Sequence, residues 1–214
     1  MSILQRWSVV VPVKRPELAK TRLADAVGEL RPQLARAFAA DTIEAALSCA
    51  LVGAVVVVTD DGIMATEAAS LGARIVPDAP DAGLNAALRH GAEVIRDDEP
   101  RAAVASLSAD LPALRPLELL TVLVAAGEHP VAFVADTAGI GTTMYACAPG
   151  APFEPRFGGR SRAAHRAVGA VELNLPGIAS IRRDIDTAVD LWDAIRLGVG
   201  PRTAKLVAQL DAPV

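Results

Sequence analysis

The chain has 214 residues, of which 52% are hydrophobic and 21% charged, and its formal net charge is −4. This length and composition predict a single globular domain spanning residues 1–214. An acidic surface argues against non-specific nucleic-acid binding, and an aromatic content of 3% argues against a base-stacking platform. The sequence has no apolar run of 18 residues and no secretory leader, so we expect a cytoplasmic protein with no membrane span.

Strand and helix patterns alternate along the first two thirds of the chain. Short apolar runs rich in Val and Ile predict buried strands, whereas apolar residues at helical spacing predict helices. In chain order the predicted elements are a strand at 7–13, a helix at 31–50, a strand at 54–61, a helix at 62–72, a strand at 73–78, a helix at 83–98, a strand at 102–110, a helix at 116–127 and a strand at 130–137. Such alternation predicts an α/β fold, in which helices cover both faces of a largely parallel sheet.

The rhythm changes after residue 137. The later predicted elements are a glycine-rich turn leading into a strand at 139–149, a Gly/Arg-rich loop with a short helix at 153–167, a strand at 180–187, and helices at 187–198 and 200–210. We interpret this half as an insertion that binds a second substrate and is closed by the two last helices.

Three aspartates lie where predicted strands end. Asp110 ends the strand at 102–110, and Asp184 and Asp186 end the strand at 180–187, two residues apart and so on one face. A lone aspartate at such a position is more often a turn residue or helix cap. Three carboxylates at one sheet edge would repel each other, and a divalent cation removes that conflict. Mg²⁺ prefers few carboxylates together with phosphate oxygens, so the pattern favours a magnesium–nucleotide site.

A basic loop follows the first predicted strand. Its cations are Lys14, Arg15, Lys20 and Arg22. A solvated charge run is the ordinary interpretation of such a segment, but this one stands at the edge where open α/β sheets bind ligands. The motifs GxxxxGK[ST] and GxGxxG are both absent there, so a bound nucleotide would be held by side-chain cations and backbone amides.

Six segments, in order, carry a resemblance that covers nearly the whole chain. They are KRPELAKTRL (14–23), GLNAAL (83–88), SADLPAL (108–114), GIGTTMY (139–145), PRFGGRSRAAH (155–165) and RRDIDTAVDL (182–191). Together they resemble the guanylyltransferases of coenzyme F-420 biosynthesis, which couple GTP to 2-phospho-L-lactate or to phosphoenolpyruvate. The resemblance implies the three-layer fold of GT-A-like and molybdopterin nucleotidylyltransferases, with a mostly parallel central sheet. It also implies that residues 1–137 mainly bind nucleotide, and that 138–214 mainly bind the acceptor and close the site.

The resemblance assigns roles to individual residues. It implies that Asp110, Asp184 and Asp186 hold the metal, Mg²⁺, and together with Lys20 form the catalytic set. The nucleotide would be bound by Lys14, Lys20, Arg22, Asn85 and Asp110, and the acceptor by Thr142, Gly158 and Ser161. Arginines around 156–166 could neutralise the acceptor. We interpret His165 as a surface helix residue rather than a general acid, because a phosphate nucleophile needs no base.

Several functions stay open at this stage. Phosphoenolpyruvate is favoured as acceptor, with 2-phospho-L-lactate and 3-phosphoglycerate as alternatives, and the product would pass to the next enzyme of the pathway. A related enzyme acting on a sugar phosphate or molybdopterin is the nearest rival. A non-catalytic nucleotide-binding regulatory protein is the rival from another class, and it would bind GTP without metal-dependent turnover.

Overall fold

A seven-stranded sheet organises the part of the chain that the structure describes. The structure is a computed structural model that describes residues 5–14 and 21–210. Along the sheet the strands are β3 (Arg74–Val76), β2 (Val52–Val58), β1 (Trp7–Pro12), β4 (Ala103–Leu107), β6 (Thr142–Cys147), β5 (Val131–Ala135) and β7 (Val171–Glu172). Every neighbouring pair is parallel except the two that involve β6, which runs antiparallel to β4 and β5. The carboxyl ends of β1, β2 and β4 therefore share one edge.

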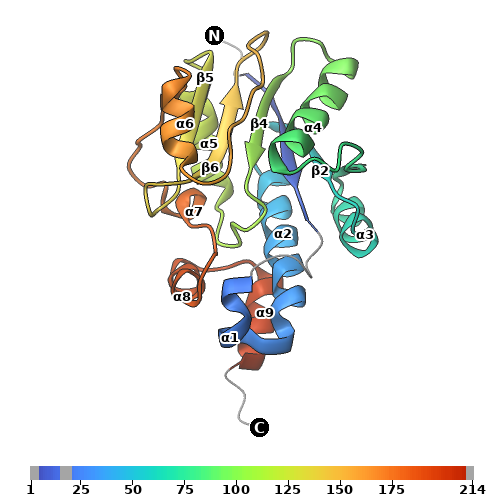
Figure 1. The fold of residues 1–214 in the computed structure, drawn as a ribbon, viewed down its shortest axis with the longest axis vertical. Coiled ribbons are helices and arrows are strands. Elements are labelled where there is room, and N and C mark those ends of the chain that lie inside the picture. The colour runs from blue at the N-terminus through green and yellow to red at the C-terminus, as the bar shows by residue number, and fades with distance from the viewer. Residues whose placement is uncertain (1–4, 15–20, 211–214) are drawn as a thin grey trace.

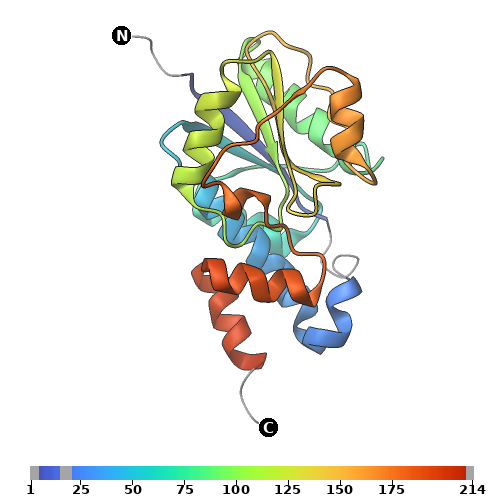
Figure 2. The same cartoon turned by 90° about the vertical axis from the view of Figure 1, so that its left-hand side faces the viewer.

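Helices cover both faces of the sheet (Figures 1 and 2). One face carries α2 (Arg31–Leu47), α3 (Gly62–Leu71), α5 (Pro116–Ala126) and α7 (Ala179–Arg182), and the other carries α4 (Leu84–Asp98) and α6 (Ser161–Ala167). Alternate residues of β1 serve the two faces, because Val9 and Val11 join the core under α2, whereas Val10 packs under α4. This arrangement confirms the predicted three-layer α/β fold with a mostly parallel sheet.

A third apolar cluster lies beyond the carboxyl edge of the sheet. It is formed by the first half of α2 with α1 (Ala24–Val27), α8 (Ala188–Leu197) and α9 (Pro201–Leu210), which gather below the sheet in both views (Figures 1 and 2). Two short 3₁₀ segments, η2 (Thr21–Leu23) and η3 (Gly28–Leu30), flank α1. Leu23, Phe38 and Ile185 are fully buried in this cluster. The C-terminal helices therefore stand beside the edge where the ligand site is expected.

Local signals in the sequence explain several element boundaries. Asp61 caps α3 by accepting the Met64 amide at 2.7 Å, and Gly72 ends that helix with φ 101°. Thr187 and Asp190 form a reciprocal capping box at the start of α8. Gly91 lets α4 approach the sheet closely, because a Cβ there would lie 2.6 Å from a methyl carbon of Val10.

One predicted element is wrong. Residues 180–187 were expected to form an alternating strand, but the structure has α7 followed by an irregular segment that runs to the cap of α8. The two apolar residues of this stretch, Ile181 and Ile185, are both fully buried but in different clusters, the first under the sheet and the second among α1, α2 and α8. The apparent alternation therefore came from two isoleucines, four residues apart, that each anchor the chain in a different cluster. The sequence did not predict β7 and α1, because they are too short to show a periodic pattern of apolar residues.

None of the helices in the described part of the chain combines the length and the apolar composition needed to cross a bilayer.

Candidate active site

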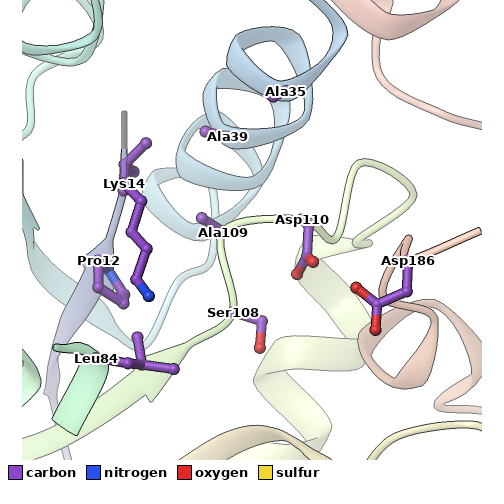
Figure 3. A pocket seen from close by; sticks show the side chains of 10 residues that line it. Pro12, Lys14, Ala35, Ala39, Leu84, Ser108, Ala109, Asp110 and Asp186 are labelled. Carbon is purple, nitrogen blue, oxygen red and sulfur yellow. The ribbon is translucent and has the colours of Figure 1, made fainter. Parts of the chain in front are cut away.

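A pocket opens beyond the carboxyl ends of β1 and β4 (Figure 3). Its volume is about 360 Å³. The lining residues come from the ends of these strands, from α2, from the start of α4 and from the segment before α8: Pro12, Val13, Lys14, Ala35, Ala39, Leu84, Ser108, Ala109, Asp110 and Asp186. In Figure 3 the carboxylates of Asp110 and Asp186 point toward one another, while Lys14 and Leu84 lie across the cavity. Three of the predicted site residues thus meet in one pocket.

The loop that carries Asp110 is held by contacts from distant elements. The Thr42 hydroxyl, from the middle of α2, accepts the Leu111 amide at 3.0 Å and donates to the Phe38 carbonyl at 2.7 Å. The Ile185 amide donates to the carbonyl of Asp110 itself at 3.2 Å, and the Gly200 amide donates to the Pro112 carbonyl at 2.8 Å. Sequence reasoning missed Thr42, whose only local signal is a polar residue on the buried face of a helix.

Asp184 and Asp186 flank the buried anchor Ile185. Asp186 is exposed and reaches the pocket, whereas Asp184 is half-buried and is not among the described residues that line it. Within residues 5–14 and 21–210, the structure places no group of three or more His, Cys, Asp or Glu side chains as a metal-binding cluster. The set of three carboxylates stays a prediction. The pair at the pocket still suits Mg²⁺, which commonly takes one or two carboxylates and completes its shell with water and phosphate oxygens.

The predicted cations fall in three different situations. Lys14 is exposed at the end of β1 and lines the pocket. Arg22 is exposed on η2 and is not among the described residues lining the pocket. Lys20 lies outside the described residues. Among the residues that the structure describes, Lys14 is thus the cation that shares the pocket with the two aspartates, which is an arrangement expected where a polyphosphate and its cation bind together.

Asn85 follows the pocket residue Leu84 and contacts the loop that is predicted to bind the acceptor. Its Nδ2 donates to the Phe157 carbonyl at 2.9 Å, and its Oδ1 accepts the Phe157 amide at 2.8 Å. Both ends of the amide group are thus used to fix residue 157, immediately before Gly158. A direct contact of Asn85 with nucleotide stays a prediction.

His165 is fully buried, so the expectation that it lies at the surface is wrong. Its ring stacks on Tyr145 with centroids 4.8 Å apart and packs against Phe133. Nε2 accepts the Arg156 amide at 2.8 Å, so in the neutral ring Nδ1 carries the proton and donates to Thr142 Oγ1 at 3.0 Å. Burial, together with the nearby Arg156 charge, lowers the pKa of His165 to about 4 and keeps it neutral near pH 7.

One of the predicted acceptor residues, Thr142, contacts this histidine directly, and Ser161 begins the helix that carries it. Thr142 begins β6, and because it accepts from His165 its hydroxyl proton is directed toward another acceptor. Gly158 has φ 103°, a conformation that favours glycine, and Ser161 is the buried first residue of α6. The structure thus fixes the environment of these three residues, and their contact with an acceptor stays a prediction.

Two of the arginines expected beside the acceptor are engaged elsewhere. Arg162 and Arg166 both pair with Glu172 of β7, at 3.0 and 2.7 Å, and Arg162 also donates to the Gly139 carbonyl at 2.9 Å. These contacts tie α6 to the edge of the sheet and to the glycine turn. Arg156 and Arg160, by contrast, are exposed in the loop before α6.

The fold is one that solved nucleotidyltransferases share. A nucleotidyl transferase from Methanothermobacter thermautotroptrophicus has the same fold, with a TM-score of 0.63 and 20% identity over 90% of this chain and 97% of that chain. A Mycobacterium tuberculosis H37Rv protein solved in complex with manganese has a TM-score of 0.53 and 17% identity, over 90% of this chain and 98% of its own. At these identities the likeness is one of fold.

The family follows from sequence. Residues 7–211 match the family model described as guanylyl transferase CofC like, and the chain belongs to this family. A Thermomonospora curvata protein is 57% identical over 96% of this chain and 90% of its own length. A Streptomyces coelicolor protein is 56% identical over 96% of this chain and 97% of its own length. Both relatives are named phosphoenolpyruvate guanylyltransferase. The chain is therefore a nucleotidyltransferase enzyme.

Proposed function

We propose that this protein transfers GMP from GTP to phosphoenolpyruvate, forming enolpyruvyl-diphosphoguanosine and pyrophosphate. The observation that carries the proposal is the pocket that Lys14 shares with Asp110 and Asp186 at the carboxyl edge of the sheet. The choice of GTP and phosphoenolpyruvate is supported by two relatives named phosphoenolpyruvate guanylyltransferase, which are 56–57% identical over nearly the full chain.

In the proposed reaction a phosphate oxygen of phosphoenolpyruvate attacks the α-phosphorus of GTP in line. The new P–O bond replaces the bond from the α-phosphorus to the bridging oxygen of the β-phosphate, and pyrophosphate leaves with that electron pair. Such transfer depends mainly on positioning and on neutralising charge. Asp110 and Asp186, with Asp184 beside them, would hold Mg²⁺, which supplies charge stabilisation for phosphate oxygens.

The remaining groups of the site bind and orient the substrates. Lys14 neutralises the triphosphate, and we propose the same role for Lys20 and Arg22. Thr142, Gly158 and Ser161 bind the acceptor, with the Thr142 hydroxyl donating to one of its anionic oxygens. A phosphate nucleophile is already ionised at neutral pH, which agrees with a histidine that is buried, neutral and committed to two hydrogen bonds.

The first test measures pyrophosphate release. Protein and Mg²⁺ are incubated with each nucleoside triphosphate, paired with phosphoenolpyruvate, 2-phospho-L-lactate or 3-phosphoglycerate. We expect the highest turnover with GTP and phosphoenolpyruvate. GTP binding without turnover on any acceptor would favour the regulatory alternative, and turnover of CTP or UTP with sugar phosphates would favour the other nucleotidyltransferases.

Substitution of the carboxylates tests the site. Asp110→Asn and Asp186→Asn should each lower kcat/KM at least 100-fold, which corresponds to about 3 kcal/mol of transition-state stabilisation. Asp97→Asn, on the exposed face of α4, is the matched control and should retain full turnover. Near-normal turnover in either pocket variant would remove that residue from the mechanism. We further propose that the product passes to the next enzyme of coenzyme F-420 biosynthesis, and that the protein acts in the cytoplasm.

A further inference from the structure

His165 joins two segments that are predicted to bind the acceptor. Its Nδ1 donates to Thr142 Oγ1 at 3.0 Å at the start of β6, and its Nε2 accepts the Arg156 amide at 2.8 Å in the loop that leads to α6. Both ring nitrogens are thus used, because a backbone amide can only donate to Nε2, which leaves the proton of the neutral ring on Nδ1. One imidazole therefore links the first residue of β6 to this loop.

The ring of His165 is held in place by aromatic side chains. Its centroid lies 4.8 Å from that of Tyr145, 5.4 Å from that of Phe133 and 5.5 Å from that of Phe157, and the residue has an exposed fraction of 0%. A phenylalanine would pack in such surroundings without the cost of burying two polar nitrogens. The feature that the histidine supplies here is therefore its pair of hydrogen bonds.

Both segments that His165 joins adjoin the catalytic pocket. In β6, the carbonyl of Thr143 accepts the amide of Ser108 at 2.9 Å, and Ser108 lines the pocket. In the loop, Phe157 follows the residue that His165 holds, and Asn85 binds the amide and the carbonyl of Phe157 at 2.8 and 2.9 Å. The predicted acceptor residues on these segments therefore stand next to the pocket proposed for the triphosphate.

The histidine sets the direction in which the Thr142 hydroxyl donates. A hydroxyl that accepts a hydrogen bond from Nδ1 turns its own proton away from the ring. Within residues 5–14 and 21–210 this hydroxyl makes no other hydrogen bond, so its proton is available to a ligand. We propose that His165 is a positioning residue for the acceptor, which turns the Thr142 hydroxyl toward an anionic oxygen of phosphoenolpyruvate and fixes the loop in front of Gly158. This inference rests on the proposed function, and it gives His165 no contact with the reacting atoms.

Two substitutions at position 165 separate the two hydrogen bonds. In His165→Gln the side-chain oxygen reaches the place of Nε2 and keeps the Arg156 amide, whereas in His165→Asn the amide group reaches the place of Nδ1 and keeps the Thr142 hydroxyl. We expect His165→Gln to raise the KM for phosphoenolpyruvate about tenfold, with kcat and the KM for GTP within about twofold of the wild type, because a directed hydrogen bond to an anion is lost. His129→Gln is the matched control, since His129 precedes the start of β5, whereas Thr142 pairs with Ala135 at the end of that strand. It should leave all three constants unchanged.

A double-mutant cycle shows whether His165 acts through Thr142. Thr142→Val should itself raise the KM for phosphoenolpyruvate about tenfold. If the histidine acts through this hydroxyl, adding His165→Gln should raise that KM by less than about twofold more, whereas two independent effects would multiply to about 100-fold. Adding His165→Asn should raise it further, because this variant loosens the loop instead. Multiplied effects of Thr142→Val and His165→Gln would overturn the inference, as would a His165→Gln variant that loses kcat while both KM values stay unchanged.

The wild-type protein supplies a readout that does not depend on the folding of a variant. The Nδ1 proton of His165 is buried, and its NMR resonance should shift when phosphoenolpyruvate engages the Thr142 hydroxyl, because hydrogen bonds in a chain polarise one another. A resonance that phosphoenolpyruvate leaves in place overturns the inference.

Calorimetry with phosphoenolpyruvate and Mg²⁺ separates the inference from the proposed function. Binding that is about tenfold tighter in the wild type than in His165→Gln, without turnover in either, supports the positioning role and refutes the proposed function. Equal binding to the two proteins refutes the inference alone. Absence of binding to the wild type refutes both.

Discussion

Thr42→Val tests how the loop around Asp110 is held in place. Thr42 is fully buried, with an exposed fraction of 0%. Its hydroxyl lies between α2 and the loop. The hydroxyl accepts the Leu111 amide at 3.0 Å and donates to the Phe38 carbonyl at 2.7 Å, with the Ala109 carbonyl at 3.3 Å. Valine has nearly the same shape but cannot accept the amide. The substitution therefore removes one anchor of the loop and leaves the volume of the core almost unchanged.

The expected loss of stability follows from the Leu111 amide, which loses its hydrogen-bond acceptor in Thr42→Val. A buried amide without an acceptor costs about 1–3 kcal/mol, so the free energy of unfolding should fall by about 2 kcal/mol. Asp110 lies one residue before that amide, and a shift of a fraction of an ångström there should lower kcat about tenfold. Thr42→Ser keeps the hydroxyl and deletes a buried methyl, which costs about 1 kcal/mol of stability without moving the loop.

The assay compares unfolding by denaturant with pyrophosphate release for Thr42→Val and Thr42→Ser. Both variants should lose stability, but only the valine variant should lose turnover. Raised Mg²⁺ should restore part of that turnover. Equal loss of turnover in the two variants would show that packing of the methyl group matters instead. Unchanged turnover in Thr42→Val would refute the idea that this hydroxyl positions Asp110.

Three further predictions concern other parts of the structure. Folding lowers the pKa of His165 from 6.5 to about 4, so the unfolded chain binds the proton more readily than the folded chain. The free energy of unfolding should therefore fall by at most about 3 kcal/mol as the pH drops from 6.5 to 4. A pH series of unfolding curves should show this loss in the wild type relative to His165→Gln. Asp41→Ala removes a buried carboxylate that accepts hydrogen bonds from two backbone amides at the start of α9. The substitution should lower the free energy of unfolding by about 2 kcal/mol and expose that helix to limited proteolysis. Gly91→Ala should lower the free energy of unfolding by about 1–3 kcal/mol although alanine has the better helix propensity, because the new methyl would lie 2.6 Å from a side chain of β1. A raised melting temperature would instead show that α4 can shift away from the sheet.

The sequence predicted the sheet and one edge of the site well. Valine-rich runs such as 54–61 and helical spacing such as 116–127 are local signals, and the structure confirms strands and helices at those places. Asp110 and Lys14 were placed by a rule about where parallel strands end, and the pocket at that edge contains both. These predictions succeeded because they needed only the order and direction of the strands.

The parts that could not be predicted depend on contacts between distant segments. His165 is buried because Phe133 and Tyr145, from two separate strands, supply the aromatic surface on which it packs. Nothing near residue 165 shows this, although Ser161 one helical turn earlier hints at a shared inward face. The segment at 180–187 was wrong for a related reason, since its two isoleucines belong to different cores. The local pattern could not separate a strand from a chain bridging two layers.

The same long-range contacts explain why the C-terminal part matters for the chemistry proposed at Asp110. The Asp110 carbonyl accepts the Ile185 amide, and the Pro112 carbonyl accepts the Gly200 amide just before α9. Asp41 then caps α9, and an added Cβ at Gly200 would meet its carboxylate. The loop is therefore clamped between α2 and the C-terminal segment. Loosening α9 through Asp41→Ala should consequently lower turnover as well as stability, whereas a cap that served the helix alone would lower stability and leave kcat unchanged below the melting temperature.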